Sequence, residues 1–246
     1  MKEEHLYSQF AEYYDKIYAK KDYHREVEFI EWAVNEHSTS SGKTMLDVAC
    51  GTGNHALLLK NNFEVLGLDL NHEMLKIAKE KVPELEFIQG DMKNMDLEKI
   101  FDAIICMFSA INYNTNEDEL EKTLRNFYMT LESGGLLIFD LGLNRENWVE
   151  GRVSVDTVVE KDLELARIGQ SHLENGVFNA SFVFLVKKNG KMDFSIDQHE
   201  LGIFETGKVL ELMEDIGFKT VVYDEFTSKV WDVKSEGRPV FVGLKH

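Results

Sequence analysis

The sequence predicts an α/β fold in which a doubly wound, mostly parallel sheet of seven strands carries an inserted antiparallel β subdomain. Between residues 44 and 141, short apolar runs alternate with polar stretches of helical periodicity, which is typical of β-α units in a parallel sheet. After residue 143 the pattern changes to long runs of alternating polarity separated by glycines, which is typical of antiparallel strands. The 246 residues, 43% of them hydrophobic, are enough for one sizeable core.

Each element is expected from its own local pattern. Apolar residues at helical spacing predict two helices between residues 8 and 36, interrupted near residues 19–23. The next five strands of the sheet are expected at 44–49, 63–68, 85–88, 101–107 and 135–141. Helical periodicity marks two of the connecting segments, 72–81 and 117–131. A helix at 206–216, ended by Gly217, precedes the last two strands at 219–226 and 239–244.

Three β-rich runs lie between the fifth strand and that helix. They are VSVDTVVEKDLELARIG, GVFNASFVFLVKK and MDFSIDQHELGIF, and we expect them to pair as an antiparallel sheet. The chain is therefore predicted to have three parts: a helical cap of residues 1–36, a main domain of residues 37–143 and 205–246, and a β insertion of residues 144–204. The insertion would cover a cleft or pair two copies of the chain, so a homodimer is an open alternative.

Charge and composition narrow the class of partner. The formal net charge is −17, from 44 acidic and 27 basic residues, and a phosphate backbone or an anionic membrane would meet net repulsion. No apolar stretch approaches about 18 residues, so we expect no membrane partner and a cytoplasmic location. Cys50 and Cys106 lie in apolar strands, and we interpret them as buried, reduced thiols rather than metal ligands. A small-molecule partner is favoured.

The stretch MLDVACGTGN, residues 45–54, carries the first functional signal. Its glycines and Ala56 satisfy the loose pattern G-x-G-x-x-G/A that binds dinucleotides, so a nicotinamide enzyme has to be considered. However, Asp47 interrupts the apolar strand that leads into the glycines. A carboxylate inside an apolar strand is costly unless it is paired, so we expect Asp47 to orient the glycine loop or a ligand ammonium group.

Two more carboxylates end the next two strands. Asp69, near the usual spacing after the glycine turn, is suited to accept both hydroxyl groups of a ribose, and Asp91 ends the strand LEFIQG. Three carboxylates at the carboxyl edge of the sheet would repel a pyrophosphate. They suit a cofactor with an ammonium, a sulfonium and a neutral adenosine, which describes S-adenosylmethionine.

These motifs resemble those of the class I S-adenosylmethionine-dependent methyltransferases. LDVACGTG is similar to their first motif, Asp69 to their ribose-binding acid, and FDAIICMFSAINY to their fourth strand. By resemblance, Asp91 would bind the adenine amino group and Met92 would pack on its ring. The cofactor contacts implied for the main domain are Asp47, Ala49, Gly51, Gly53, Asp69, Leu70, Met74, Asp91, Met92, Met107 and Phe108, although Met107 and Phe108 are also candidate core residues.

A narrower resemblance extends along most of the chain. The segments KDYHRE, CMFSAI, FDLGLNRENW and GRPVFVGL resemble those of N,N-dimethyltransferases that act on nucleotide-linked amino sugars. The resemblance implies that Tyr14, Tyr23 and Arg25 close over the methionine end of the cofactor, where Arg25 would bind the carboxylate. The chain departs from that family at Tyr113, where some members have a histidine, and at residues 141–143, where they have Pro-Trp-Trp.

The function expected from these patterns is N-methylation of a small amine by S-adenosylmethionine. Tyr14 and Tyr113 are the candidates for orienting the nitrogen, and Arg238, with Arg152 as a second choice, would hold a substrate diphosphate. His24, His172 and His199 could act as bases, but we interpret each as solvated or structurally bonded. A methyltransferase for an oxygen or carbon acceptor and a non-catalytic cofactor-binding protein are the alternatives.

Overall fold

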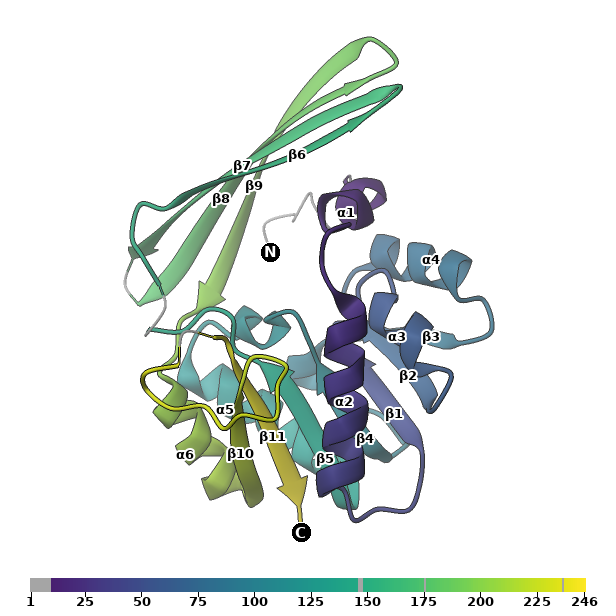
Figure 1. Cartoon of the computed structure of the whole chain (residues 1–246), viewed down its shortest axis with the longest axis vertical. Coiled ribbons are helices and arrows are strands. Elements are labelled where there is room, and N and C mark those ends of the chain that lie inside the picture. The colour runs from purple at the N-terminus through teal and green to yellow at the C-terminus, as the bar shows by residue number, and fades with distance from the viewer. Residues whose placement is uncertain (1–9, 146–147, 175, 236) are drawn as a thin grey trace.

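The computed structural model describes residues 10–145, 148–174, 176–235 and 237–246. A seven-stranded sheet with the order β10-β11-β5-β4-β1-β2-β3 forms the main domain, and β11 runs antiparallel to both of its neighbours. A four-stranded antiparallel sheet with the order β6-β7-β8-β9 projects from one end of that domain (Figure 1). The predicted fold class is confirmed.

The strands of the main sheet are β1 (Thr44–Val48), β2 (Glu64–Asp69), β3 (Glu86–Gln89), β4 (Phe101–Cys106), β5 (Leu131–Asp140), β10 (Phe218–Asp224) and β11 (Pro239–Lys245). The α-helices are α1 (Ala11–Ile17), α2 (Tyr23–His37), α3 (Asn54–Leu59), α4 (His72–Lys81), α5 (Glu117–Thr130) and α6 (Thr206–Ile216). Two short 3-10 helices are η1 (Met92–Asn94) and η2 (Ala110–Tyr113). Helices α4 and α6 have the predicted bounds, and α5 ends one residue earlier than predicted.

Local capping explains several of these boundaries. Asp22, Asn71 and Asn116 each accept a backbone N–H in the first turn of α2, α4 and α5, respectively. Gly217, at φ 116°, ends α6 in the left-handed conformation that glycine adopts without a steric penalty.

The helices cover both faces of the main sheet. On one face α5 and α6 pack against the strands around the buried rings of Phe127 and Phe139. On the other face α2, α3 and α4 pack around Ile30, Leu59 and Leu75. Because β1, β4 and β5 are buried on both sides, their residues are mostly apolar. A buried carboxylate within one of these strands, such as that of Asp47 in β1, is therefore unusual.

The insertion consists of β6 (Val153–Glu160), β7 (Leu163–Glu174), β8 (Val177–Lys188) and β9 (Lys191–Gly202). The first of the three predicted β-rich runs, VSVDTVVEKDLELARIG, is by itself a hairpin that turns at Lys161 and Asp162. That turn was missed because it contains no glycine, whereas the other two turns of the sheet contain Gly176 and Gly190.

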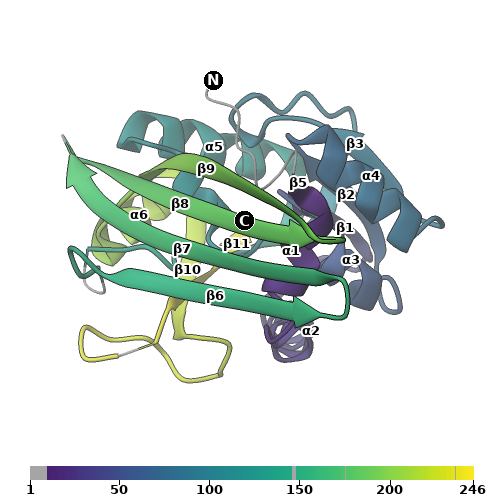
Figure 2. The same ribbon diagram turned by 90° about the horizontal axis from the view of Figure 1, so that it is seen from above.

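The two faces of the insertion have different surroundings. Its inner face lies over α1 (Figure 2), where Phe10 stacks on Phe184 with ring centroids 5.1 Å apart. Its outer face leaves apolar side chains exposed, and these are Val153, Val155, Val159, Ile168, Leu185, Met192, Phe194 and Ile196. The insertion therefore covers the edge of the main domain, and the pairing of two copies through the outer face stays a prediction.

The insertion leaves and re-enters the main domain at adjacent points. Asn144 forms a β-bridge with Phe204, and the Arg145 N–H donates to the Phe204 carbonyl at 3.1 Å. The buried amide of Asn112, in η2, donates to the carbonyls of Leu143 and Gly202, both at 2.8 Å. One side chain after β4 thus holds both ends of the insertion against the sheet edge.

Three further expectations concern membrane-spanning helices, the two cysteines and the first residues of the chain. None of the described helices is both long enough and apolar enough to cross a membrane. Cys50 and Cys106 are buried and unpaired with each other, as predicted, and burial raises the pKa of both thiols. The first nine residues of the predicted helical cap lie outside the described residues.

Candidate active site

The loops that follow β1 to β5 meet at the carboxyl edge of the sheet. In the first loop, Ala49, Gly51 and Gly53 all have a positive φ, of 56°, 55° and 77°. A non-glycine residue in that conformation is strained, and such strain is concentrated at functional sites. A Cβ atom on Gly51 would have no heavy atom within 4 Å, so the space above this loop is open to a ligand.

Asp69, at the end of β2, holds the glycine loop. Its Oδ2 accepts the Gly51 N–H at 2.8 Å, and its Oδ1 accepts the Asn71 N–H at 2.8 Å. Asn71 caps the following helix, because its side chain accepts the backbone N–H groups of Glu73 and Met74. Asp69 therefore is not needed as the helix cap, and its carboxylate lies at the loop where a ribose is expected.

Asp47 is the most unusual carboxylate of the edge. It is 1% exposed, and its Oδ2 has no hydrogen-bond partner in the part of the chain that the structure describes. Burial, followed by a smaller effect of the nearby Asp69, raises its pKa to about 7, although the charge of His55 acts in the opposite direction. An unpaired buried acceptor of this kind needs a donor, and a ligand ammonium group would supply one.

The N-terminal segment closes over the same loop. Asp15, in α1, accepts from Thr52 Oγ1 at 2.6 Å and from Asn54 Nδ2 at 2.9 Å, and it pairs with Lys81 at 2.7 Å. These bonds attach α1 to the helix that starts at the glycine loop. Burial raises the pKa of Tyr23 to about 12, so its phenol stays protonated and can donate a hydrogen bond.

The basic side chain that lies against Tyr23 is that of Lys21 rather than that of Arg25. The Arg25 guanidinium, predicted to bind the cofactor carboxylate, pairs with Glu225 at 2.9 Å, and both side chains are 46% exposed. Lys21 is largely buried; it forms an ion pair with Glu26 and lies 4.2 Å from the ring centroid of Tyr23. Burial lowers the pKa of Lys21, although the charge of Glu26 opposes the shift. The contact of Arg25 with the cofactor carboxylate therefore stays a prediction, and Lys21 of the same KDYHRE segment is a second candidate for it.

The remaining predicted cofactor contacts differ in accessibility. Met74 and Met107 are 1% and 3% exposed, so both side chains are buried, and their contacts with the cofactor stay predictions. Leu70 is 53% exposed beside Asp69. Asp91 caps η1 through the Lys93 N–H at 2.9 Å, and Met92 is partly buried behind it. The adenine contacts of Asp91 and Met92 stay predictions.

The loop after β4 carries a second strained turn. Phe108 and Ser109 have φ values of 60° and 61°. The carboxylate of Asp140, fully buried at the end of β5, accepts both the Ser109 N–H, at 3.0 Å, and the Ser109 hydroxyl, at 3.1 Å. Arg238 Nη1 donates to the same carboxylate at 2.9 Å. Asp140 therefore stabilises the turn that places Phe108 in the wall of the adjacent cavity.

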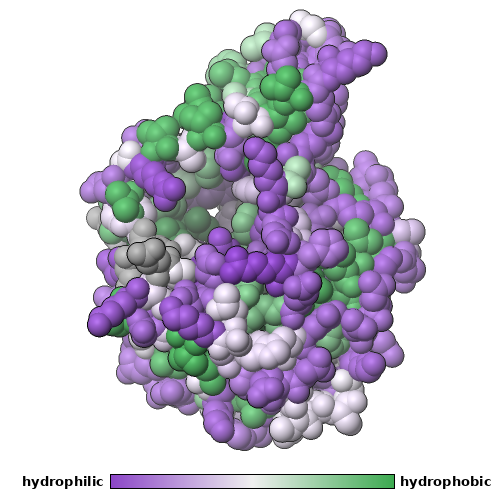
Figure 3. All heavy atoms as spheres, viewed as in Figure 1, coloured by the Kyte–Doolittle hydropathy of each residue, from purple (hydrophilic) through white to green (hydrophobic). Residues whose placement is uncertain are grey.

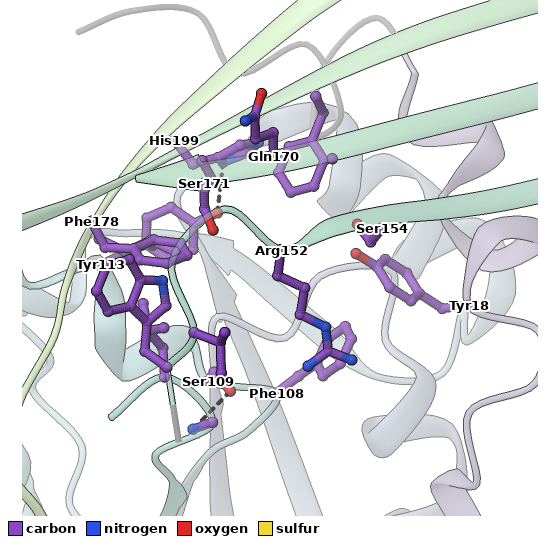
Figure 4. Close-up of a pocket in the computed structure, with 18 residues that line it drawn as sticks. Tyr18, Phe108, Ser109, Tyr113, Arg152, Ser154, Gln170, Ser171, Phe178 and His199 are labelled. Atoms are coloured by element: carbon purple, nitrogen blue, oxygen red, sulfur yellow. Dashed lines mark hydrogen bonds between the residues drawn. The ribbon is translucent and has the colours of Figure 1, made fainter. Parts of the chain in front are cut away.

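A cavity of about 610 Å³ lies between this edge and the inner face of the insertion. Figure 3 shows the surface hollowed beneath the projecting sheet, and Figure 4 shows the cavity wall. Of the residues predicted to serve the substrate or cofactor, Phe108, Tyr113 and Arg152 line it. Gly142 and Leu143, from the segment expected to form a substrate wall, line it as well.

Two predicted substrate residues are not in this lining. Tyr14 packs its ring 4.8 Å from Tyr18, and Tyr18 is the aromatic residue of that pair that faces the cavity. Arg238 is engaged by Asp140, whereas Arg152 extends towards Phe108 (Figure 4). Arg152 lines the cavity, so its guanidinium is placed where a substrate would lie.

The sequence predicts a solvated or structurally bonded His199, and the structure places this residue, bonded on both ring nitrogens, in the cavity wall. Its Nδ1 lies 2.9 Å from the Tyr113 hydroxyl, and its Nε2 lies 2.9 Å from Asp197 Oδ2. The run MDFSIDQHELGIF does contain the alternation that places Asp197 and His199 on one face of a strand. Nothing in that run indicates that this face would meet Tyr113.

Comparisons with known proteins identify the family of the chain. Residues 45–135 match the family described as a methyltransferase domain. A dTDP-3-amino-3,6-dideoxy-alpha-D-glucopyranose N,N-dimethyltransferase of Streptomyces fradiae is 33% identical over 195 residues, covering 78% of this chain and 75% of that protein. A dTDP-3-amino-3,4,6-trideoxy-alpha-D-glucopyranose N,N-dimethyltransferase of Streptomyces venezuelae is 30% identical and covers 95% and 97%. The crystal structure of DesVI from S. venezuelae has a TM-score of 0.83 at 27% identity, covering 96% of this chain and 98% of that one.

Proposed function

The chain belongs to the S-adenosylmethionine-dependent methyltransferase family that includes the N,N-dimethyltransferases of dTDP-linked amino sugars, and we propose that it methylates the amine of a nucleotide-linked amino sugar. The observation that carries the proposal is the cavity beside Phe108. At about 610 Å³ it is within the range of small-molecule sites, and the strained turn at Phe108 brings its wall to the edge where the cofactor is expected.

The described residues fit S-adenosylmethionine at the edge of the sheet. The unpaired Oδ2 of Asp47 suits the ammonium group, Asp69 suits the ribose hydroxyls, and the open space above Gly51 leaves room for both. Lys21 supplies a buried cation for the methionine carboxylate. When bound, this cofactor supplies an electrophilic methyl group on a sulfonium.

The chain's own residues position the acceptor and exclude water. The aromatic rings of Tyr18, Phe178 and Phe182 form an apolar wall for the sugar, while Tyr113 presents a hydroxyl group to the nitrogen. Methyl transfer depends on an aligned nitrogen lone pair and a dry site, and these are the roles that we assign to Tyr113 and to the aromatic wall.

Arg152 rather than Arg238 is proposed to hold the substrate diphosphate. Replacement of Arg152 by alanine is expected to raise KM for the sugar nucleotide by about 10- to 150-fold, the equivalent of one lost charge-assisted hydrogen bond. Because the contact binds ground and transition states alike, kcat should change little. Initial-rate kinetics measure both constants, and Arg125→Ala, at an exposed helical pair with Glu121, is the matched control. An unchanged KM in Arg152→Ala would remove the residue from the diphosphate site.

The acceptor is tested by mass spectrometry of the products. The protein is incubated with S-adenosylmethionine and either dTDP-3-amino-3,6-dideoxy-alpha-D-glucopyranose or the same sugar nucleotide with a hydroxyl in place of the amine. We expect a mass gain of one or two methyl groups in the amine only. If the hydroxyl compound is methylated instead, or if a wider set of phenols and carbon acids reacts while no amine does, the proposal fails and the family assignment remains.

A further inference from the structure

Two consecutive hydrogen bonds connect Tyr113, His199 and Asp197 and lead from the cavity into the insertion. Tyr113 lies in η2, after β4, and His199 and Asp197 lie on the inner face of β9. His199 is 3% exposed and Asp197 is fully buried, whereas Tyr113 is half-buried and lines the cavity with His199 (Figure 4). Both hydrogen bonds are 2.9 Å long, and the one between Tyr113 and His199 connects residues that are 86 positions apart.

The chemistry of the three groups determines which atom donates and which accepts in each of the two hydrogen bonds. An ionised carboxylate only accepts hydrogen bonds, so His199 Nε2–H donates to Asp197 and the proton stays on Nε2. Nδ1 of the neutral imidazole is then an acceptor, and the Tyr113 hydroxyl donates to it. In this state the phenol oxygen still has acceptor capacity for a donor in the cavity, and an alkylammonium group is such a donor.

An ammonium acceptor cannot be methylated until it loses a proton. We propose that Tyr113 and His199 remove that proton from the acceptor of the function proposed above, on which this inference rests. An N–H bond of the ammonium breaks as an O–H bond forms at Tyr113, and the original phenol proton moves to His199 Nδ1. The freed nitrogen lone pair then takes the methyl group, with the electrons of the C–S bond leaving on sulfur. The imidazolium returns its proton to solvent when the product leaves.

The surroundings of His199 favour this step. Once His199 has taken up the proton, its imidazolium forms an ion pair with Asp197, 2.9 Å from Nε2, and this ion pair stabilises the charge inside the sheet. Strand β8 presents Ala180 and Phe182 to this histidine, and the Phe182 ring lies edge-on with centroids 5.5 Å apart. Among the described residues, the charged or titratable groups of other elements that line this cavity are Tyr18 after α1 and Arg152 before β6. Arg167 in β7 lies 5.1 Å from the Phe182 ring, and its charge is balanced by Asp156 at 2.6 Å.

In this arrangement Tyr113 is a catalytic residue, because it touches the acceptor, while His199 and Asp197 act through it. A purely structural role would stabilise the fold and would not change the pH dependence of the rate. The proton-transfer role can therefore be separated from a structural one by the pH profile of kcat/KM.

The experiment compares the wild-type protein with His199→Asn and Tyr113→Phe across pH 6 to 10. The probe is dTDP-3-amino-3,6-dideoxy-alpha-D-glucopyranose, and the control is His172→Asn, a histidine on β7 with a 56% exposed side chain. At pH 7 we expect both variants to lose about 10²- to 10⁴-fold in kcat/KM, the usual contribution of a positioned base. The gap should close towards pH 10, because solvent then deprotonates the amine, and His172→Asn should follow the wild type.

A second measurement needs no turnover. Nitrogen NMR of the imidazole in the ligand-free protein should show a neutral His199 near pH 7 with its proton on Nε2, and Asp197→Asn should make that ring harder to protonate. A ring that is positively charged throughout pH 6 to 9 could not accept a proton, and this result would overturn the proposal. So would a loss of kcat/KM that is equal at all pH values. If the wild-type protein methylates no amine, the proposed function itself has failed, which is visible without any variant.

Discussion

Replacement of Asp140 by alanine is expected to lower the free energy of unfolding by about 3 kcal/mol and to reduce methyl transfer strongly. The substitution leaves the Ser109 N–H without its acceptor and Arg238 without its partner, and a buried donor left unpaired costs about 1–3 kcal/mol. The Arg238 side chain is 32% exposed, so water recovers part of its loss. Activity should fall further than stability alone explains, because the turn that presents Phe108 depends on this carboxylate.

Urea denaturation of the ligand-free protein measures this change, with Asp215→Ala, at an exposed position near the end of α6, as the control. The double variant Asp140→Ala/Arg238→Met should recover stability relative to Asp140→Ala, because it removes the charge that the single substitution strands. A single variant as stable as the wild type would show that the Phe108 turn is held by other contacts.

Replacement of Asp47 by asparagine is expected to stabilise the ligand-free protein at pH 8 by about 2–4 kcal/mol and to weaken cofactor binding. In the unfolded chain Asp47 loses its proton near pH 4, whereas in the folded protein burial holds its pKa at about 7. The folded state binds this proton more tightly, so the contribution of Asp47 to stability decreases as pH rises from about 4 to 7. Asparagine has nearly the same shape and does not ionise.

The difference between Asp47→Asn and the wild type should therefore be small at pH 4 and largest above pH 7. Urea denaturation at several pH values tests this, with Asp91→Asn, at a partly exposed helix cap, as the matched control. Calorimetric titration with S-adenosylmethionine should show lower affinity for Asp47→Asn, because the neutral amide cannot form a charge pair with the ligand ammonium. A stability difference that does not depend on pH would mean that Asp47 is ionised to the same extent in both states.

The fold and the cofactor edge could be predicted because their signals are local. Each β-α unit has its own periodicity, and Asp47, Asp69 and Asp91 stand at strand ends that a parallel sheet brings to one edge. The hairpin turn at residues 161–162 was missed because Lys-Asp is a weak turn signal compared with glycine.

The acceptor side of the site depends on contacts between distant segments. Whether Arg238 or Arg152 is available to a substrate depends on Asp140, which lies 98 residues before Arg238 in the chain. His199 becomes part of the cavity only because the inner face of β9 meets η2. The periodicity of a sequence indicates which face of a strand a residue occupies, but it does not predict which other segment that face will contact.

The bridge between Asn144 and Phe204 places the two ends of the insertion side by side, so this segment is a module that one exchange of contiguous residues could replace. The glycine loop, Asp47 and Asp69 all lie outside it, whereas Arg152, Phe182 and His199 lie within it. Selection for a new acceptor can therefore change the part of the cavity wall that the insertion supplies while the proposed methyl-donor site is inherited unchanged. A chimera that carries the 144–204 segment of a relative should take the acceptor preference of that relative, provided that Asn112 still joins both ends.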